Sequence, residues 1–377
     1  MKKIKNKKIL YIVSDANFFL SHRIDIALMA KKNGYEIHLA SIQSNSLKTL
    51  KSKGIITHSL SSTLIKNKIF LSLNLFFNTF NLIRKINPNI IQIITIFNVL
   101  SSGLSLLFLK NKNIIFSISG LGYLFTEKSI FTKIVKTIFL NILFLIFFLK
   151  QPKVIFQNKE DYKDLDYYRI LDKKNIIFIK GSGVNTKKYN GNKVSCKNNI
   201  LFASRLLVHK GINEFLEAAK IIKNKYKNFN FIVAGKIDYN NPSFIKKSKL
   251  IEYKNKKIIT YVGYKKNLIK IFKKTSIFVL PSYREGTPKV LIEAMSFGLP
   301  IIASKISGCK TIIRHNKNGI LIPIKNPNIL ANAIVKLHNN KRLMDLISKN
   351  GKKFAKDNLD IKLVTKKHLK IYNHFLK

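Results

Sequence analysis

The sequence predicts an α/β protein made of two doubly wound domains, each built on a parallel sheet, that face each other across a cleft. Three observations support this fold class. The chain has 377 residues, which is long for one ordinary domain and suits two. Hydrophobic residues make up 46% of the chain, enough to fill two cores. Short apolar runs alternate with helical patterns along the whole length, as in sheets whose parallel strands are joined by helical crossovers.

The first series of elements fills the N-terminal half. A buried strand is predicted at residues 8–13, and an amphipathic helix follows at about 19–32, closed by Asn33 and Gly34. The chain then returns as a second strand at 35–40. Short apolar runs predict four further strands, at residues 89–94, 113–118, 153–157 and 175–180.

A second series begins after a polar stretch at residues 185–199, which contains Gly191 and is predicted to be the linker. Its strands are expected at residues 199–204, 230–235, 258–263, 276–281 and 300–304. The expected division is an N-terminal domain at 1–185 and a C-terminal domain at 186–355. Residues 356–377 are expected to form a C-terminal helix that packs back on the N-terminal domain.

The charge is strongly basic, with 69 lysine and arginine residues against 18 acidic ones and a net charge of +51. Because only seven of these basic residues are arginine, one interpretation is a lysine-biased composition that fills solvated positions. The other is attraction to an anionic membrane surface, which is worth up to about 1 kcal/mol per nearby basic residue. Nucleic acid is a weaker alternative, since the lysines are scattered and no nucleic-acid-binding motif is present.

The compartment and the membrane topology follow from simple counts. The two cysteines, Cys196 and Cys309, cannot form a disulfide framework or a zinc site alone, which indicates a reducing, cytoplasmic compartment. No cleavable signal peptide is expected after the basic residues 1–8. The most apolar stretch, residues 137–150, is shorter than the roughly 20 residues of a membrane span. A buried helix is therefore expected there, with a helix dipping into one leaflet as the alternative.

The stretch PSYREGTPKVLIEAM, residues 281–295, combines a strand end, a turn and a helix start. Thr287 is expected as the N-cap and Pro288 as the first helical residue. The free amides of such a turn suit a phosphate, while Glu285 and Glu293 could accept hydrogen bonds from sugar hydroxyls. The alternative is one solvated loop glutamate and one ordinary helix glutamate.

Two other strand ends carry candidate ligand-binding residues. Arg205 and Lys210 lie in a loop after a strand, and Gly211 opens the next helix, which is typical of a diphosphate clamp. A lone surface pair of cations is the alternative. In KGSGVN, residues 180–185, two glycines permit positive φ and a close backbone approach to a ligand.

Together these segments resemble the retaining glycosyltransferases of family 4, whose GT-B architecture has two Rossmann-like domains. EGTPKVLIE resembles that family's Glu–seven residues–Glu motif, SRLLVHKG its phosphate motif and GSGVN its interdomain loop. SGCKTIIRHNKNGILIP, residues 307–323, matches a further family motif in spacing. Residues 18–41 and SISGLGYLF are similar to the branch that builds capsular, lipopolysaccharide and lipid-linked oligosaccharides. That branch includes N-acetylgalactosaminyltransferases acting on undecaprenyl diphosphate acceptors.

The resemblance implies specific roles in the C-terminal domain, which would bind a nucleotide sugar. Arg205 and Lys210 would bind the donor diphosphate, and Glu293 would hold the ribose hydroxyls. Glu285 would contact the donor sugar as a catalytic residue. The remaining donor-side residues would contribute backbone amides or close approach: Gly183, Gly286 and Thr287.

The N-terminal domain would bind the acceptor. The resemblance places His22, a second catalytic candidate, and Arg23 at the start of the first helix, facing the cleft. Gly120 and Gly122 are expected on the same acceptor side. For His22 the alternative is a helix-cap residue without chemistry.

Two positions depart from the family pattern: Thr311 stands where a glutamate is usual, and Asn185 where an aspartate is usual. Asp164 and Asp166 resemble the metal-binding pair of the other large glycosyltransferase fold, but their acidic surroundings indicate a solvated helix face. No metal and no other cofactor is expected.

The resulting hypothesis is a retaining enzyme on the inner face of the plasma membrane. It would transfer a hexose or N-acetylhexosamine from a nucleotide sugar, expected to be UDP-linked, to a lipid-linked saccharide in cell-surface polysaccharide synthesis. The lysines and the apolar segment 131–148 would hold it to the anionic leaflet. Two alternatives stay open: a sugar-nucleotide epimerase of the same fold, and a basic nucleic-acid-binding module.

Overall fold

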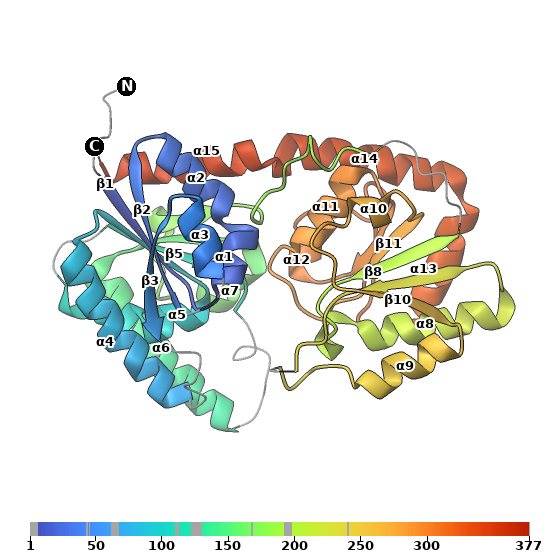
Figure 1. Ribbon diagram of the computed structural model, residues 1–377, viewed down its shortest axis with the longest axis horizontal. Helices are drawn as coiled ribbons and strands as arrows, with labels where there is room; N and C mark the ends of the chain where they lie inside the picture. Colours follow the sequence, from blue (N-terminus) through green and yellow to red (C-terminus); the bar gives the residue numbers. More distant parts are fainter. Residues whose placement is uncertain are drawn as a thin grey trace. The chain divides into compact units, whose positions relative to one another are not determined.

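The computed structural model describes residues 7–42, 44, 46–61, 68–109, 113–121, 130–166, 169–191, 198–239 and 241–376. The chain divides into two compact units (Figure 1). The N-terminal unit comprises Met1–Ser182 and Val364–Lys377, and the C-terminal unit comprises Gly183–Leu363. Each unit has its own parallel sheet with helices packed on it, so the predicted α/β architecture of two doubly wound domains is confirmed.

The N-terminal unit is built on a seven-stranded parallel sheet of order β3-β2-β1-β4-β5-β6-β7. Its strands are β1 (Lys7–Ile12), β2 (Tyr35–Ile42), β3 (Ile56–Ser61), β4 (Ile90–Ile94), β5 (Asn113–Ile118), β6 (Lys153–Phe156) and β7 (Ile176–Phe178). The strand order reverses between β1 and β4, which creates a switch point where ligands of such sheets usually bind. Every residue of β4 is buried, because helices cover both faces of the sheet.

The helical elements of this unit follow the strands along the chain. They are α1 (Ala16–His22), α2 (Ile24–Lys32), α3 (Ser46–Ser52), α4 (Lys68–Ile86), α5 (Ile96–Ser101), η1 (Gly103–Phe108), α6 (Ile130–Lys150), α7 (Lys159–Asp166) and η3 (Lys173–Asn175). The single helix expected at 19–32 is wrong. Asp15 caps a helix that starts earlier, and the chain breaks at Arg23, whose φ of −127° and ψ of −12° leave the helical region.

The C-terminal unit has a six-stranded parallel sheet of order β10-β9-β8-β11-β12-β13. Its strands are β8 (Asn199–Ala203), β9 (Asn230–Ala234), β10 (Ile259–Gly263), β11 (Ile277–Leu280), β12 (Ile301–Ser304) and β13 (Ile320–Ile322). Its helical elements are η4 (Val208–Lys210), α8 (Ile212–Lys225), α9 (Lys247–Asn255), α10 (Ile269–Phe272), α11 (Lys289–Phe297), α12 (Ser307–Lys310), α13 (Pro327–Asn339) and α14 (Lys341–Leu359).

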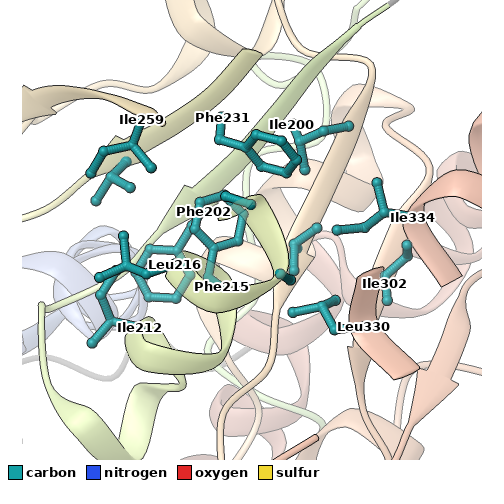
Figure 2. Close-up of a cluster of buried hydrophobic side chains, with 14 of the residues drawn as sticks. Ile200, Phe202, Ile212, Phe215, Leu216, Phe231, Ile259, Ile302, Leu330 and Ile334 are labelled. Carbon is teal, nitrogen blue, oxygen red and sulfur yellow. The ribbon is translucent and has the colours of Figure 1, made fainter. Parts of the chain in front are cut away.

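The core of the C-terminal unit lies between its sheet and helices α8 and α13 (Figure 2). Phe215 of α8 contacts Phe202 of β8 in a tilted arrangement and Phe231 of β9 edge to face, with ring centroids 5.4 and 5.8 Å apart. Leu330 and Ile334 of α13 fill the same layer. This packing fixes the sheet on which the β8 and β11 strand ends are carried.

The chain crosses between the units after Ser182 and again after Leu363, so the polar stretch 185–199 is not the linker. Its described part belongs to the C-terminal unit, where Lys352 Nζ donates to Gly191 O at 2.7 Å. Val184 N donates to Leu359 O at 3.1 Å, and Ile361 N donates to Val184 O at 2.8 Å. The two crossing segments are therefore paired through backbone hydrogen bonds within one unit.

The C-terminal helix α15 (Ile361–His374) packs on the N-terminal sheet from Val364 onward, whereas residues 356–359 are the end of α14 in the C-terminal unit. Tyr372 donates its hydroxyl to Gln92 Oε1 at 2.6 Å, and the Tyr11 hydroxyl lies 3.0 Å from that of Tyr372. His368 is fully buried on the same helix, and its Nδ1 lies 3.0 Å from Val364 O. The two contacts of the Tyr372 hydroxyl tie α15 to strands β1 and β4.

The apolar stretch expected to be a buried helix forms α6, which is 21 residues long and buried on one face only. Phe139, Leu143 and Ile146 are buried, whereas Phe144 and Phe148 are exposed. Across the described residues, the structure contains no helix with the length and hydropathy required to cross a membrane.

We expect His368 to make the fold sensitive to acid. Burial, and then the charge of Arg23, lower the pKa of His368 to about 3. The unfolded chain protonates this imidazole near pH 6.5. The contribution of His368 to the free energy of unfolding is therefore fully present above pH 6.5 and is lost as the pH falls toward 3. The loss is up to about 1.4 kcal/mol per pH unit.

Chemical unfolding of His368→Leu should show a shallower loss of stability between pH 6.5 and 4 than the wild type. The control is His374→Leu, an exposed histidine on the same helix. Parallel pH profiles for wild type and His368→Leu would contradict the prediction.

Candidate active site

The carboxyl ends of β8 and β11 form the centre of the candidate site. These strands pair in parallel, with Phe202 opposite Val279, so the loops that follow them leave the same edge of the sheet. Gly211, at φ +78°, allows the two loops to touch, because a Cβ there would lie 2.1 Å from Pro281 O. A hydrogen bond of 2.9 Å from Tyr283 N to His209 O fixes the contact. Only glycine satisfies both the backbone angle and the close approach.

Lys210 and Glu285 meet across this contact. Lys210 Nζ donates to Glu285 Oε1 at 2.6 Å, and Ser282 Oγ donates to the same oxygen at 2.9 Å. Both charged side chains are largely buried, at 14% and 11% exposed. The carboxylate is thus held in one orientation by two donors from two loops. An ammonium has three donor hydrogens, so Lys210 retains capacity for a further acceptor.

Gly308 of the short α12 lies directly against the backbone of Glu285 and Gly286. A Cβ at Gly308 would lie 2.0 Å from Gly286 O and 2.4 Å from Glu285 O. The next residue, Cys309, is fully buried, and burial raises the pKa of its thiol. That thiol remains protonated at neutral pH, so Cys309 is a packing residue rather than a nucleophile.

The helix after this loop starts one residue later than predicted. Helix α11 begins at Lys289, and Pro288 is the cap residue, with φ −69° but an extended ψ of 118°. The expectation that Thr287 is the N-cap and Pro288 the first helical residue is therefore wrong. The ring of proline fixes φ alone, so it is compatible with a cap as well as with a first turn.

Glu293 lies one turn further along α11, and its surroundings differ from those of Glu285. Burial raises the pKa of the Glu293 carboxyl, while Lys289, a hydrogen bond from Tyr189 and Lys188 act in the opposite direction. Lys289 Nζ is 4.0 Å from Glu293 Oε1. Tyr189 escaped the sequence analysis because it lies in the stretch interpreted as a linker.

Arg205 is not part of the Lys210–Glu285 pair. Its Nη1 donates to Asp238 Oδ2 at 3.2 Å in the loop after β9, and its side chain is more than half exposed. Leu206 N donates to Lys236 O at 3.0 Å, which ties the two loops together. A hollow of about 430 Å³ adjoins this loop and is lined by Lys236, Ile237, Tyr239, Lys247, Leu250, Ile251, Lys254 and Tyr261. No pattern in the sequence indicates Asp238 or this hollow.

The two glycines of KGSGVN adopt the positive φ for which they were singled out. Gly181 and Gly183 adopt φ of +66° and +70°. In the N-terminal unit Gly120, just after β5, has φ +136°. Gly122 lies outside the described residues.

His22 and Arg23 lie at the junction of α1 and α2 rather than at the start of a helix. His22 stacks on Phe18 with ring centroids 4.5 Å apart, and its Nδ1 lies 2.6 Å from Ser21 Oγ. Arg23 is only 2% exposed and is enclosed in the N-terminal unit beneath α15. The expectation that Arg23 faces a cleft is therefore wrong, since its guanidinium has no surface to offer an acceptor.

Asp164 and Asp166 lie on α7, where Tyr162 donates its hydroxyl to Asp166 Oδ2 at 2.7 Å. Within the ranges that the structure describes, no three His, Cys, Asp or Glu side chains gather closely enough to hold a metal ion.

Two protein families match this chain, one in each half. The family described as "Glycosyl transferase 4-like" matches residues 8–148, and "Glycosyl transferases group 1" matches residues 184–354. The second range contains Lys210, Glu285 and Glu293.

Relatives and a solved structure agree with this match. The chain is 28% identical over 276 residues to the N,N'-diacetylbacillosaminyl-diphospho-undecaprenol alpha-1,3-N-acetylgalactosaminyltransferase of Campylobacter jejuni, covering 69% of this chain and 70% of that protein. It is 31% identical over 158 residues to the UDP-Gal:alpha-D-GlcNAc-diphosphoundecaprenol alpha-1,3-galactosyltransferase of Escherichia coli, covering 41% of this chain and 40% of that one. A glycosyltransferase structure from Rickettsia africae superposes over 99% of both chains with a TM-score of 0.76 at 22% identity, which shows a common fold.

We expect Gly308→Ala to disturb the site without unfolding the unit. The new methyl group would overlap the carbonyls of Glu285 and Gly286, so the loop must move and Glu285 must shift relative to Lys210. Thermal unfolding and nucleotide binding by calorimetry would measure the two effects separately. The control is Gly103→Ala, where the nearest atom is 3.5 Å from the added Cβ. Unchanged nucleotide affinity in Gly308→Ala would show that the loop position does not matter.

Proposed function

From the premise that the chain belongs to the glycosyltransferases matched over residues 8–148 and 184–354, we propose a retaining transferase that uses a nucleotide sugar. The donor is a UDP-linked hexose or N-acetylhexosamine, and the acceptor is a lipid-linked saccharide. The observation that supports this proposal most is the buried Lys210–Glu285 pair, 2.6 Å apart, at the carboxyl edge of the C-terminal sheet. That edge is where open parallel sheets bind their ligands.

The diphosphate of the donor would bind where cations and amides converge. Lys210 uses one donor hydrogen on Glu285 and has others for phosphate oxygens. Arg205 would exchange its exposed contact with Asp238 for a bidentate contact with the second phosphate. The amides of Gly286, Thr287 and the first turn of α11 add partial positive charge. These groups supply the positive charge that a metal provides elsewhere, so we propose a metal-independent reaction.

The two glutamates would recognise hydroxyl groups at opposite ends of the donor. Glu285 is oriented through Oε1 by Lys210 and Ser282, which suits it to accept a hydrogen bond from the transferred sugar. Glu293 would accept from the ribose hydroxyls. A carboxylate next to neutral hydroxyl donors makes charge-assisted hydrogen bonds, which are stronger than neutral ones.

The chemical step would need little from the protein beyond charge stabilisation. The bond between the anomeric carbon and the diphosphate oxygen breaks, and negative charge develops on the leaving diphosphate. The acceptor hydroxyl attacks from the same face and passes its proton to a leaving phosphate oxygen, which gives retention of configuration. Lys210, Arg205 and the helix amides stabilise the leaving group where the charge appears.

The acceptor side is proposed from the relatives. The names of the Campylobacter and Escherichia enzymes both specify a diphospho-undecaprenol-linked sugar as the acceptor. We propose that this chain also extends an undecaprenyl-diphosphate-linked saccharide, at the inner face of the plasma membrane, during cell-surface polysaccharide synthesis. His22, Gly120 and Gly122 are the residues proposed to contact it in the N-terminal unit.

Glu285→Gln should lower the turnover number by about 100-fold or more, because the amide loses the charge that binds the sugar in the transition state. The dissociation constant for UDP should change little, since the phosphate-binding groups remain. Turnover is measured as acceptor-dependent UDP release, and a chelating agent should leave it unchanged.

The matched control for this substitution is Glu252→Gln, which alters an exposed glutamate paired with Lys256 on α9. Full activity of Glu285→Gln would remove this residue from the mechanism. Conversion of the nucleotide sugar to its epimer without acceptor would favour the epimerase alternative over transfer.

Tyr189→Phe should make nucleotide binding more sensitive to acid. Burial already raises the pKa of Glu293, and the Tyr189 hydroxyl counteracts this by donating to the carboxylate. Removal of that donor raises the pKa further, so the carboxylate that binds ribose is lost at a higher pH as the pH falls. The affinity for UDP, measured by calorimetry from pH 8 to pH 5, should decline earlier than in the wild type.

Tyr253→Phe is the matched control, because Tyr253 also donates to a glutamate, Glu217, at a distance from the site. The maximal turnover number with saturating donor should be similar in both variants and in the wild type. Superimposable pH profiles for Tyr189→Phe and the wild type would contradict the role given to this tyrosine.

A further inference from the structure

Helix α6 is apolar on the side that faces the solvent as well as on the side that faces the core. Leu143 and Ile146 pack into the N-terminal core, while Phe144 and Phe148 are 53% and 69% exposed and stack on each other. Ile138 is also exposed on this helix. A helix that packs one face on a core normally presents polar residues on the other. Thr137 and Asn141 are the polar residues exposed on its described part, and after Asn141 every exposed residue of α6 is apolar: Phe144, Leu145, Phe148 and Leu149.

A second apolar stripe lies on α4. Phe70, Leu73 and Phe77 are all more than half exposed, and their spacing of three and four residues places them on one side of the helix. Phe76 contacts Phe77 and also Phe108 at the end of η1, with ring centroids 5.0 and 5.9 Å apart. Phe108 is 68% exposed.

The two stripes adjoin through η1, which packs against both α4 and α6. Lys150 Nζ at the end of α6 donates to Leu109 O at 2.7 Å, directly after Phe108. In Figure 1 helices α4 and α6 lie on one side of the N-terminal unit. We name this surface the aromatic face and define it by six exposed residues: Phe70, Leu73, Phe77, Phe108, Phe144 and Phe148.

Among the residues that the structure describes, exposed phenylalanine is confined to this unit. Every phenylalanine that is exposed among the described residues belongs to the N-terminal unit, and all but Phe178 are in the aromatic face. The exposed apolar residues of the C-terminal unit are instead aliphatic residues and tyrosines. Contiguous apolar patches of this kind mark binding surfaces, whereas single exposed apolar residues are ordinary.

The charge around the aromatic face selects its partner. Between Glu36 and Glu160 the sequence contains 15 lysine and arginine residues and a single acidic residue, Glu127. The whole chain has a much lower ratio, 69 to 18. This segment includes α4, η1 and α6, so the aromatic face is surrounded by an almost acid-free, cationic sequence. Two copies of such a face would repel each other, while an anionic bilayer offers both acyl chains and negative headgroups.

We propose that the aromatic face is the membrane-docking surface of this protein, with its phenylalanines at the boundary between headgroups and acyl chains of an anionic leaflet. The inference deepens the proposed function, since a lipid-linked acceptor must be reached at that boundary. It also goes beyond the apolar segment 131–148 by including α4 and η1. The described helices lie on the bilayer and do not cross it, as for amphipathic interfacial helices.

The absence of tryptophan from the sequence allows a direct test, because Phe148→Trp introduces the only tryptophan. The probe is a vesicle of equal parts phosphatidylglycerol and phosphatidylcholine with brominated acyl chains. Emission of Phe148→Trp should shift to shorter wavelength and be quenched, and Phe77→Trp should behave in the same way. Tyr226→Trp in the C-terminal unit is the control and should remain unquenched.

Neutral phosphatidylcholine vesicles should give a weaker response, and salt should reduce the response to anionic vesicles. If the full chain pellets with anionic vesicles while both probes in the aromatic face stay unquenched, a different surface docks and the proposal is wrong. This experiment requires no turnover, so its failure is distinguishable from failure of the proposed function.

A second test removes the apolar contacts. The triple variant Phe77→Ser, Phe108→Ser, Phe148→Ser should partition onto anionic vesicles about tenfold or more weakly than the wild type. Its control is Ile329→Ser, Leu346→Ser, Leu363→Ser, which removes three exposed apolar residues from the C-terminal unit. Transfer to a water-soluble acceptor analogue should be unchanged in both, whereas transfer to an acceptor embedded in vesicles should fall only in the first.

Equal vesicle partition by the first triple variant and the wild type would overturn the proposal. So would a wild-type dimer that the triple variant converts to a monomer, because the face would then be an interface between two copies. Thermal unfolding checks that the variant is folded, and the tryptophan probes remain informative if it is not.

Discussion

The close approach of two loops at Gly211 and Pro281 is the constraint on which the candidate site depends. Without it, Lys210 and Glu285, which are 75 residues apart in sequence, would not meet at 2.6 Å in a largely buried position. The approach rests in turn on the parallel pairing of β8 and β11 and on the aromatic core beneath them. Gly308 likewise allows a close backbone approach, to the carbonyl groups of Glu285 and Gly286. The positions of the candidate site residues Lys210 and Glu285 therefore depend on how closely the backbones of the two loops pack.

Much of the fold was predictable, because strands buried on both faces leave continuous apolar runs in the sequence. The β5 range was predicted without error and β11 nearly so. The strands that were missed are β3 and β13, both at sheet edges. Strand β3 reads ITHSLS, in which polar and apolar residues mix, and β13 has only three residues. The break between α1 and α2 was also missed, since no proline or glycine marks Arg23 and only tertiary packing of its buried side chain explains it.

The residues of the candidate site also fall into two groups, those that local sequence predicts and those that it does not. Residues within one turn motif, such as Gly286, Glu285 and Glu293, can be read from local spacing. Partners that come from distant segments cannot, and Tyr189 and Asp238 belong to that group. Arg23 shows the reverse error: a charged residue beside a candidate histidine looked like a ligand-binding group, yet it is buried beneath the C-terminal helix. Local sequence predicts which chemical groups are present, and long-range packing decides which of them can meet a ligand.

The large excess of basic residues has different consequences for the two units, because each unit also has a few side chains of another kind. In a chain with 69 basic residues, attraction of an anion is not selective, because the field favours any phosphate or anionic surface. Selectivity must then come from the scarce features: carboxylates in the C-terminal unit, and exposed phenylalanines in the N-terminal unit. In the proposed function, Glu285 and Glu293 would distinguish a sugar nucleotide from a bare phosphate, since they offer acceptors to hydroxyl groups. In the proposed docking, the aromatic face would distinguish a bilayer from other polyanions, since only a bilayer has an apolar layer beneath its charge. On these two proposals, the specificity of each unit would come from a few carboxylates or phenylalanines and not from the abundant lysines.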